Sequence, residues 1–334
     1  SKVLRELEQA SSMGQGKKLY DANKAVYKLL RYGVKVKADV SSNTETIFLI
    51  DWENPDANDF SIAEEVSIEG ENKKRPDIVI YVNGIALGVI ELKRSSVSVA
   101  EGIRQNLDNQ EKHFIRDFFT TMQLVMAGND TEGLRYGTIE TGEKYYLTWK
   151  EQNPDYNPKV DEKEHKYLNA IECDGGDNAL DCAILRMMEK SRFLEIIHDF
   201  IVYDSGVKKT CRHNQYFGVQ EAQKHIQKRE GGIIWHTQGS GKSLTMVWLA
   251  KWIRENVTNP RVLIITDRTE LDEQIEKVFG GVDEQIYRTK SGKDLIGTLN
   301  AKSEWLIGSL VHKFGREDAD ASDDFIKELQ QSLP

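Results

Sequence analysis

A glycine-rich segment in the second half of the chain constrains the fold more than any other feature. Its sequence is His236-Thr237-Gln238-Gly239-Ser240-Gly241-Lys242-Ser243, and it lies between an apolar run at 232–235, expected to be a short buried strand, and a helix expected from Lys242 to about Arg254. Glycines let backbone N–H groups approach phosphate oxygens, and the following helix presents its positive N-terminus. The segment therefore predicts a strand–loop–helix unit that binds the phosphates of a nucleotide.

The residue types within this loop suit that role. We expect Lys242 to reach the β- and γ-phosphates and the hydroxyl of Ser243 to ligate Mg²⁺. The rest of the phosphate cradle would come from Thr237, Gly239, Ser240 and Gly241. An ordinary glycine-rich turn is the alternative, and His236 stands where the GxxxxGK[ST] pattern has its first glycine.

Strand-like and helix-like runs alternate after the loop. Apolar runs at 261–266 and 306–310 are expected to be buried strands, with a helix across 270–279 between them. Strand–helix–strand alternation favours a parallel sheet. We therefore expect residues 205–334 to begin a parallel α/β domain.

The first half of the chain mixes both kinds of pattern. Residues 21–31 have helical spacing and end at Gly33, and residues 97–119 are also expected to be helical. The arms 78–82 and 86–90 should form a hairpin closed by Asn83-Gly84, since both residues tolerate the positive φ of a tight turn. Further strand character is expected at 46–51, 63–68, 134–139 and 144–149.

The two halves are expected to be joined by a polar segment and a helix. The polar run 150–178 predicts a surface excursion, and residues 179–202 predict a helix. The core face of that helix would hold Leu185, Met188, Phe193, Ile196, Ile197 and Phe200. We therefore expect an α/β domain at 1–178, a helical linker at 179–204 and the second α/β domain at 205–334.

Two acids and one lysine converge on the predicted hairpin. Asp77 follows Pro76 at the start of one arm, and Glu91 and Lys93 follow the other arm. Glu91 and Lys93 should share a face, because residues two apart on a strand do so. Carboxylate oxygens suit Mg²⁺, which lowers the pKa of bound water and neutralises charge on a phosphate. We expect Asp77 and Glu91 to hold Mg²⁺ and Lys93 to position the attacking water; solvent-facing charges at a strand end are the alternative.

Composition limits the classes of protein to which the chain can belong. The net charge of −9 over 334 residues argues against non-specific coating of DNA. Lys73-Lys74-Arg75 and Lys208-Lys209 could still line a local basic cleft; solvated loops are the alternative for each run. The acidic stretch Glu317–Asp324 is expected to be a solvated loop. Three cysteines form no CxxC pair, and no apolar run approaches the roughly 20 residues of a membrane span. We therefore expect a cytoplasmic location without a membrane partner.

The segments 77–84, 89–93 and 234–243 together resemble the HsdR motor/restriction subunit of type I restriction–modification enzymes. The resemblance extends from the helix at 21–31 to at least Leu271. It implies a PD-(D/E)xK restriction-endonuclease-like mixed sheet with flanking helices, followed by part of the first RecA-like domain of a superfamily 2 motor. It also implies double-stranded DNA as substrate, Mg²⁺ and ATP as cofactors, and methyltransferase (HsdM) and specificity (HsdS) subunits as partners.

The resemblance assigns roles to several other residues. Gln215 would read adenine through its amide; a helix-capping or surface glutamine is the alternative. Arg268 lies in a segment that would contact the DNA backbone; helix capping by Thr269 is the alternative for that segment. Many of these nuclease domains carry Q-x-x-x-Y after the lysine. Gln105 fits and could contact DNA or orient the site, but Asn109 stands in place of the tyrosine, whose part is therefore open. Asp21 is the nearest candidate for an assisting acid.

These features imply Mg²⁺-dependent, non-specific double-strand cleavage coupled to ATP-driven DNA translocation. No DExH-type acid pair and no second RecA-like domain precede Pro334, so we expect part of a longer polypeptide that hydrolyses ATP poorly on its own. One alternative is a superfamily 2 helicase or remodeller with a degenerate nuclease domain that only binds DNA. The others are a partner-docking module with ATP as a switch and a P-loop metabolic kinase. The recognition sequence, translocation polarity and subunit interfaces are not predicted.

Overall fold

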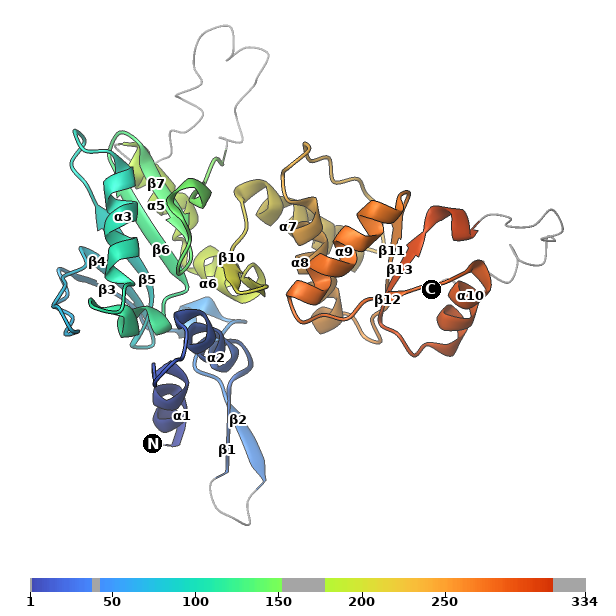
Figure 1. Ribbon diagram of the computed structural model, residues 1–334, viewed down its shortest axis with the longest axis horizontal. Helices are drawn as coiled ribbons and strands as arrows, with labels where there is room; N and C mark the ends of the chain where they lie inside the picture. The colour runs from blue at the N-terminus through green and yellow to red at the C-terminus, as the bar shows by residue number, and fades with distance from the viewer. Residues whose placement is uncertain (1, 38–42, 152–177, 315–334) are drawn as a thin grey trace, which may run out of the picture. The chain divides into compact units, whose positions relative to one another are not determined.

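The computed structural model describes residues 2–37, 43–151 and 178–314. The chain divides into two compact units, residues 1–213 and 214–334, whose elements Figure 1 shows. The boundary lies later than the one expected at 204/205, and residues 179–204 belong to the first unit. Nearly all of the expected excursion at 150–178, and the acidic stretch Glu317–Asp324, lie outside the described residues.

A six-stranded mixed sheet forms the centre of the first unit, in the order β3-β4-β5-β6-β7-β8. Neighbouring strands are antiparallel except for β5 and β6, which are parallel. The strands are β3 (Phe60–Glu64), β4 (Ile78–Val82), β5 (Ile85–Leu92), β6 (Leu124–Asn129), β7 (Gly133–Gly137) and β8 (Leu147–Thr148). The predicted hairpin is confirmed: Asn83 and Gly84 join β4 to β5 with φ values of 50° and 77°.

Helices cover both faces of this sheet. Helix α3 (Val99–Asn109) begins where the Ser98 side chain accepts the Ala100 N–H, and it packs against Ala127 of β6. Helix α5 (Ala179–Met187) lies against the adjacent position, Gly128, and therefore on the opposite face. The other helices of the unit are α1 (Lys2–Ser11), α2 (Leu19–Tyr32), α6 (Lys190–Asp199) and the 3₁₀ helices η1 (Pro55–Ala57), η2 (Arg116–Thr120) and η3 (Glu143–Tyr145).

The main core of the first unit joins helix α2, the η2 region and the sheet. Its buried members are Leu19, Val79, Val89, Ile115, Phe119, Met122, Val125 and Ile139. Helix α2 supplies the face expected from its spacing, with Ala22, Val26 and Leu30 buried, and it ends at Gly33 as predicted. Gly33 has a φ of 76°, a backbone conformation that residues with a Cβ rarely adopt.

Two small antiparallel sheets complete this unit: β1 (Val34–Lys37) with β2 (Thr44–Ile47), and β9 (Val202–Asp204) with β10 (Val207–Lys209). Lys208 of β10 is buried, and its ammonium donates to Asn23 Oδ1, the Met122 carbonyl and Gln123 Oε1 at 2.8, 3.1 and 2.7 Å. Burial lowers the pKa of Lys208 well below its usual range. The expectation that Lys208 contributes to a basic cleft is therefore wrong, because its three donors tie β10 to the core.

The second unit contains the predicted parallel sheet, in the order β11-β13-β12. Its strands are β11 (Val262–Thr266), β12 (Tyr287–Arg288) and β13 (Leu306–Leu310). The accompanying helices are α7 (His213–Gln227), α8 (Lys242–Asn256), α9 (Thr269–Gly281), α10 (Gly292–Ala301) and the 3₁₀ helix η4 (Val311–Phe314). The expected helices after the glycine-rich loop and after β11 are thus confirmed.

The apolar run at 232–235 is not a strand, contrary to expectation. Ile233 and Trp235 are each 89 % exposed. A strand satisfies its backbone groups by pairing with a neighbour. No described strand pairs with this run, so its backbone stays irregular and its side chains stay in solvent.

Three expected elements of the first unit were also placed wrongly. Strand β2 ends at Ile47 rather than continuing to residue 51, and β3 lies at 60–64 rather than at 63–68. The helix expected at 97–119 ends at Asn109. There the Gln110 side chain donates to the Asn106 carbonyl. Side-chain amides compete in this way with the backbone hydrogen bonds of a helix, and a 3₁₀ helix resumes only at Arg116.

The helix expected at 179–202 is two helices. The carboxylate of Glu189 accepts the backbone N–H groups of Ser191 and Arg192, so a new helix begins at Lys190. The break changes which residues face the core: Leu185 is 50 % exposed and Met188 half-buried, whereas Met187 is buried. Phe193, Ile196, Ile197 and Phe200 are buried as expected. No helix in the described ranges is long and apolar enough to cross a membrane.

Candidate functional sites

The β4–β5 hairpin brings Asp77 and Glu91 together. Ile78 pairs with Ile90, so the next residues outward in this antiparallel register are Asp77 and Glu91. Glu91 is fully buried. The Asp77 carboxylate accepts the Leu92 N–H at 2.7 Å and also lies within hydrogen-bonding reach of the Glu91 carboxyl. The two acids therefore share one site, as the sequence predicted.

Helix α3 completes this site through two amide side chains one turn apart. Gln105 donates to Glu91 Oε2 at 2.8 Å, and Asn109 donates to Glu91 Oε1 at 3.3 Å. Gln105 also accepts a hydrogen bond from Lys93 Nζ at 2.7 Å. The side chains of Lys93, Gln105, Glu91 and Asn109 thus form one continuous hydrogen-bonded chain.

The contact of Asn109 with Glu91 was not foreseen, since the sequence showed only that a tyrosine was missing. The spacing of Gln105 and Asn109 was a partial signal, because residues four apart lie on one face of a helix, but it does not show what that face contacts. Asn109 is buried, and its Oδ1 atom has no hydrogen-bond partner in the described structure. A buried acceptor without a partner is costly, so a further donor at this atom would stabilise the site.

The acid pair has an unusual proton affinity. Burial, followed by the nearby charge of Asp77, raises the pKa of Glu91 from 4.5 to about 8, and the charges of Lys93 and Lys74 oppose that rise. Two facing carboxyls in a dry site cannot both stay ionised without a compensating cation. The pair therefore holds either a proton or a cation at neutral pH.

The carboxyls of Asp77 and Glu91 are suited to binding a divalent metal. Two adjacent carboxyls offer the hard oxygen ligands that Mg²⁺ prefers, and the remaining positions of its shell are commonly waters. No group of three or more His, Cys, Asp and Glu side chains suited to a metal occurs in the part of the chain that the structure describes. A metal here would thus rely on Asp77, Glu91 and solvent.

The glycine-rich loop turns on two glycines directly before a helix. Gly239 and Gly241 have φ values of 76° and 85°, and α8 begins directly after Gly241. Lys242 Nζ donates to the carbonyls of His236 and Thr237 at 3.1 and 2.9 Å, so it spans the loop. The Ser240 hydroxyl is buried without a partner among the described residues. Ser243 lies in the first turn of α8.

Gln215 is placed differently from the prediction. It lies inside the first turn of α7, rather than before a helix that starts near residue 220. Its amide donates to the Gly241 carbonyl at 2.9 Å. A Cβ at position 241 would lie 2.5 Å from the Gln215 amide nitrogen. Gln215 therefore contacts the loop itself, and its role toward adenine stays a prediction.

The segment after β11 exposes a basic side chain. Arg268 is exposed and lies 3.6 Å from Asp267. Arg268 also occupies the N-cap position of α9, with no side-chain cap, so the helix-capping alternative for Thr269 does not hold. Asp272 of the same helix is buried and pairs with Arg288 at 2.6 Å, which links α9 to β12.

Each of the three cations in the basic run 73–75 contacts a neighbouring side chain. Lys73 lies 3.1 Å from Glu69, and Arg75 lies 3.3 Å from Glu65. The Lys74 ammonium lies 3.9 Å from the ring centre of Phe114, and its charge lowers the pKa of Glu91. Of the three, Lys74 is the one whose charge reaches the acid pair.

Asp21 is not brought to the acid pair. It is exposed in the first turn of α2, and its negative charge acts on Glu140. The charges that act on Glu91 are those of Asp77, Lys93 and Lys74. The arrangement gives no support to an assisting role for Asp21.

Family models match both units. Residues 2–144 match the model of the type I restriction enzyme R protein N terminus, and residues 214–332 match that of the SWI2/SNF2 ATPase. The resemblance found in the sequence is thereby confirmed. The two matched regions together include the acid pair, both amides of α3 and the glycine-rich loop.

Curated relatives agree with these matches. The chain is 28% identical over 317 residues to a putative type I restriction enzyme MjaIXP endonuclease subunit of Methanocaldococcus jannaschii, covering 89% of the chain and 30% of that protein. It is 29% identical over 295 residues to the type I restriction enzyme HindI endonuclease subunit of Haemophilus influenzae, covering 82% and 26%. The chain thus spans less than a third of the length of either relative.

Proposed function

Because the chain joins a region of the type I restriction enzyme R protein N terminus to a SWI2/SNF2 ATPase region, we propose that it is the nuclease-bearing part of a type I restriction endonuclease subunit. The acid pair with Lys93 on the β4–β5 hairpin carries the proposal. The full protein would cleave double-stranded DNA with Mg²⁺ after ATP-driven translocation. It would do so with methyltransferase (HsdM) and specificity (HsdS) subunits.

Each side chain of the hairpin site has a distinct task in this proposal. Asp77 and Glu91 would hold Mg²⁺, which when bound neutralises charge on the scissile phosphate and makes its water more acidic. Lys93 would orient the attacking water. Gln105 fixes Lys93 and Glu91 relative to one another, because it hydrogen-bonds both.

The glycine-rich loop would bind ATP. Gly239, Ser240, Gly241 and Thr237 would surround the phosphates, and Ser243 would ligate the Mg²⁺ of the nucleotide. Lys242 would exchange its two backbone carbonyls for phosphate oxygens, which are stronger acceptors because they are charged. Gln215 would then sense the nucleotide through its contact with Gly241.

The second candidate is a superfamily 2 DNA motor whose first unit only binds DNA. The two-carboxylate site is the observation that favours it, since the described residues offer no third acidic, His or Cys ligand. The hydrogen-bonded Lys93–Gln105–Glu91 chain, with Glu91 buried at its end, argues against it. A fully buried acid beside a second acid is costly to the stability of the fold. Its presence therefore favours a catalytic role for the site.

Calorimetric titration with Mg²⁺ or Mn²⁺ separates the two candidates. Wild type should bind one metal in the first unit, and Asp77→Ala and Glu91→Ala should each abolish that binding. Asp21→Ala is the matched control, since it removes an acid of the same unit that is not brought to the pair. Equal titrations for wild type and both site variants would favour the DNA-binding motor.

A further inference from the structure

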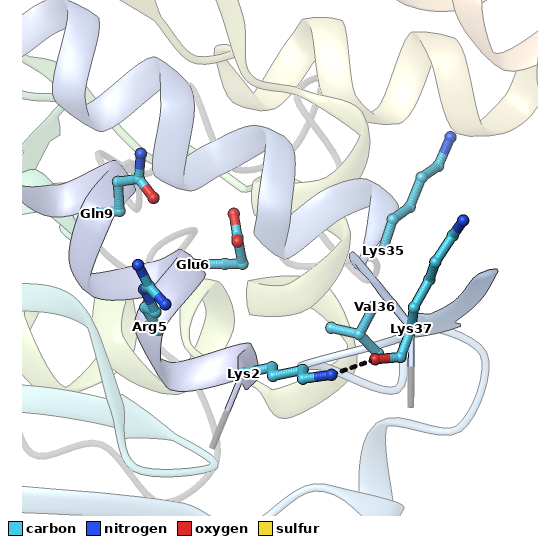
Figure 2. A pocket seen from close by; sticks show the side chains of 7 residues that line it. All are labelled: Lys2, Arg5, Glu6, Gln9, Lys35, Val36 and Lys37. Carbon is cyan, nitrogen blue, oxygen red and sulfur yellow. Dashed lines mark hydrogen bonds between the residues drawn. The ribbon is translucent and has the colours of Figure 1, made fainter. Parts of the chain in front are cut away.

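Helix α1 and strand β1 form a basic hollow. It contains no residue of the acid pair or of the glycine-rich loop. Its volume is about 420 Å³, and it is lined by Lys2, Arg5, Glu6, Gln9, Lys35, Val36 and Lys37. Figure 2 shows these side chains, with Lys35 and Lys37 extending alongside each other from β1. The lining carries four cations and one acid, in a chain whose net charge is −9.

The sequence explains why these cations converge. Positions 2, 5, 6 and 9 have i, i+3, i+4, i+7 spacing and therefore share one face of α1. Lys35 and Lys37 are two apart on β1, so they share one face of the strand about 6.8 Å apart. Lys2 Nζ donates to the Lys37 carbonyl at 2.6 Å, which joins the helix face to the strand.

Three of the four cations of this hollow have no carboxylate partner within the described structure. Arg5, Lys35 and Lys37 form no ion pair with any described carboxylate, whereas Lys73, Arg75 and Arg104 all do. Like charges held close together repel, and an anion relieves that repulsion. The hollow is therefore suited to a ligand that carries negative charge.

We propose that this hollow binds the phosphodiester backbone of double-stranded DNA, an inference that rests on the proposed nuclease function. Its four cations are all exposed, and they lie on two sides of an open space. A DNA duplex carries a regular extended array of phosphates, which Lys and Arg side chains neutralise. Charge complementarity here favours the extended ligand.

Salt-dependent DNA binding tests the hollow without any cleavage. A fluorescent duplex of arbitrary sequence is titrated with the chain in EDTA at several NaCl concentrations, and binding is followed by anisotropy. Each lost phosphate contact should lower the slope of log K against log[salt] by about 0.9. The variant Lys35→Gln/Lys37→Gln should thus lower the slope by about 1.8 and weaken binding.

A matched variant separates a specific contact from loss of charge. Lys112→Gln/Lys228→Gln removes the same two charges from exposed positions elsewhere and should leave the slope near wild type. Arg5→Gln supplies an independent test on α1, in case the double variant disturbs the β1–β2 pairing. The proposal is overturned if wild type does not bind the duplex, or if the hollow and control variants lose equal affinity.

Inorganic tripolyphosphate distinguishes the source of the phosphate. If calorimetry shows that it binds the wild-type hollow while the duplex slope is unchanged in the variants, the site serves a free phosphate and the DNA proposal fails. Metal binding at Asp77 and Glu91 is measured separately. A negative result for DNA binding at the hollow can therefore be told apart from a negative result for metal binding at the proposed nuclease site.

Discussion

Glu91 is fully buried at the end of a strand, and its carboxyl group is hydrogen-bonded by side chains from the hairpin and from α3. Asp77 faces it across the hairpin, and Gln105 and Asn109 reach it from α3. An isolated buried carboxylate would be strongly unfavourable, so these contacts decide its charge state. The proton of this acid and its amide partners can each be tested by experiment.

Without metal, the raised pKa of Glu91 should make the first unit less stable as pH rises. Between its usual 4.5 and about 8, the folded state keeps a proton that the unfolded chain has lost. Folding thus takes up a proton, and stability falls by up to about 1.4 kcal/mol per pH unit in this window. Urea unfolding in EDTA from pH 5 to 8.5 measures the slope. Glu91→Gln cannot ionise and should flatten it.

Glu45→Gln provides the control for this experiment, because Glu45 is an exposed residue of β2 in the same unit. Its stability should keep the wild-type dependence on pH. Parallel slopes for Glu91→Gln and wild type would contradict the buried, protonated acid pair.

The amide of Asn109 should matter for metal binding although the tyrosine of related domains is missing. Asn109→Leu removes a donor to Glu91 Oε1, whose 3.3 Å contact is long, so a loss near 1 kcal/mol is expected. This corresponds to a roughly fivefold higher Kd for Mn²⁺ by calorimetry. Asn109→Gln keeps an amide and should recover part of the affinity. Equal affinities in wild type and Asn109→Leu would show that Asn109 is only a packing residue.

At the scale of elements, sequence patterns predicted those turns, helix ends and strands that depend on neighbouring residues in the chain. The Asn83-Gly84 turn, the end of α2 at Gly33 and the parallel sheet that contains β11 and β13 were all foreseen. The break at Glu189 was not, because a glutamate that caps a helix looks like any other helical residue. The run at 232–235 was missed because strand formation depends on a partner elsewhere in the chain.

The candidate site followed the same rule. Register and alternation placed Asp77, Glu91 and Lys93 together from sequence alone. The hydrogen bonds from Gln105 and Asn109 depend on how α3 packs against the sheet, which no local pattern encodes. The basic hollow was missed for the same reason, since its two faces come from elements that the sequence does not pair.

The close approach of α3 to the sheet should depend on Gly102. A Cβ at this position would lie 3.0 Å from Ala127 Cβ, 3.4 Å from the Glu91 carbonyl and 3.5 Å from Lys93 Cγ. Gly102→Ala should therefore shift α3 outward, destabilise the unit by about 1–3 kcal/mol and weaken metal binding. Thermal unfolding and calorimetry measure the two effects.

Gly297→Ala is the matched control for this change. Gly297 is also helical, but nothing lies within 4 Å of its added Cβ. Alanine should there stabilise the helix by up to about 1 kcal/mol. If Gly102→Ala proves equally stabilising and leaves metal affinity unchanged, tight packing of α3 does not position the amides.

At the scale of the whole molecule, the proposed function assigns a different role to each of the two units. The first holds an acid pair suited to cutting a phosphodiester, and the second holds a loop suited to a nucleotide. In the proposed enzyme cutting follows translocation, so loss of the loop should stop both activities. Loss of the acid site should stop cutting alone.

The most direct test is therefore a comparison of Lys93→Ala and Lys242→Ala in the full-length protein assembled with its methyltransferase and specificity subunits. ATP hydrolysis and cleavage of DNA carrying a recognition site are measured on the same preparations. Lys93→Ala should abolish cleavage and keep ATP hydrolysis, whereas Lys242→Ala should abolish both. Cleavage retained by Lys93→Ala would contradict the assignment of the β4–β5 hairpin as the nuclease site.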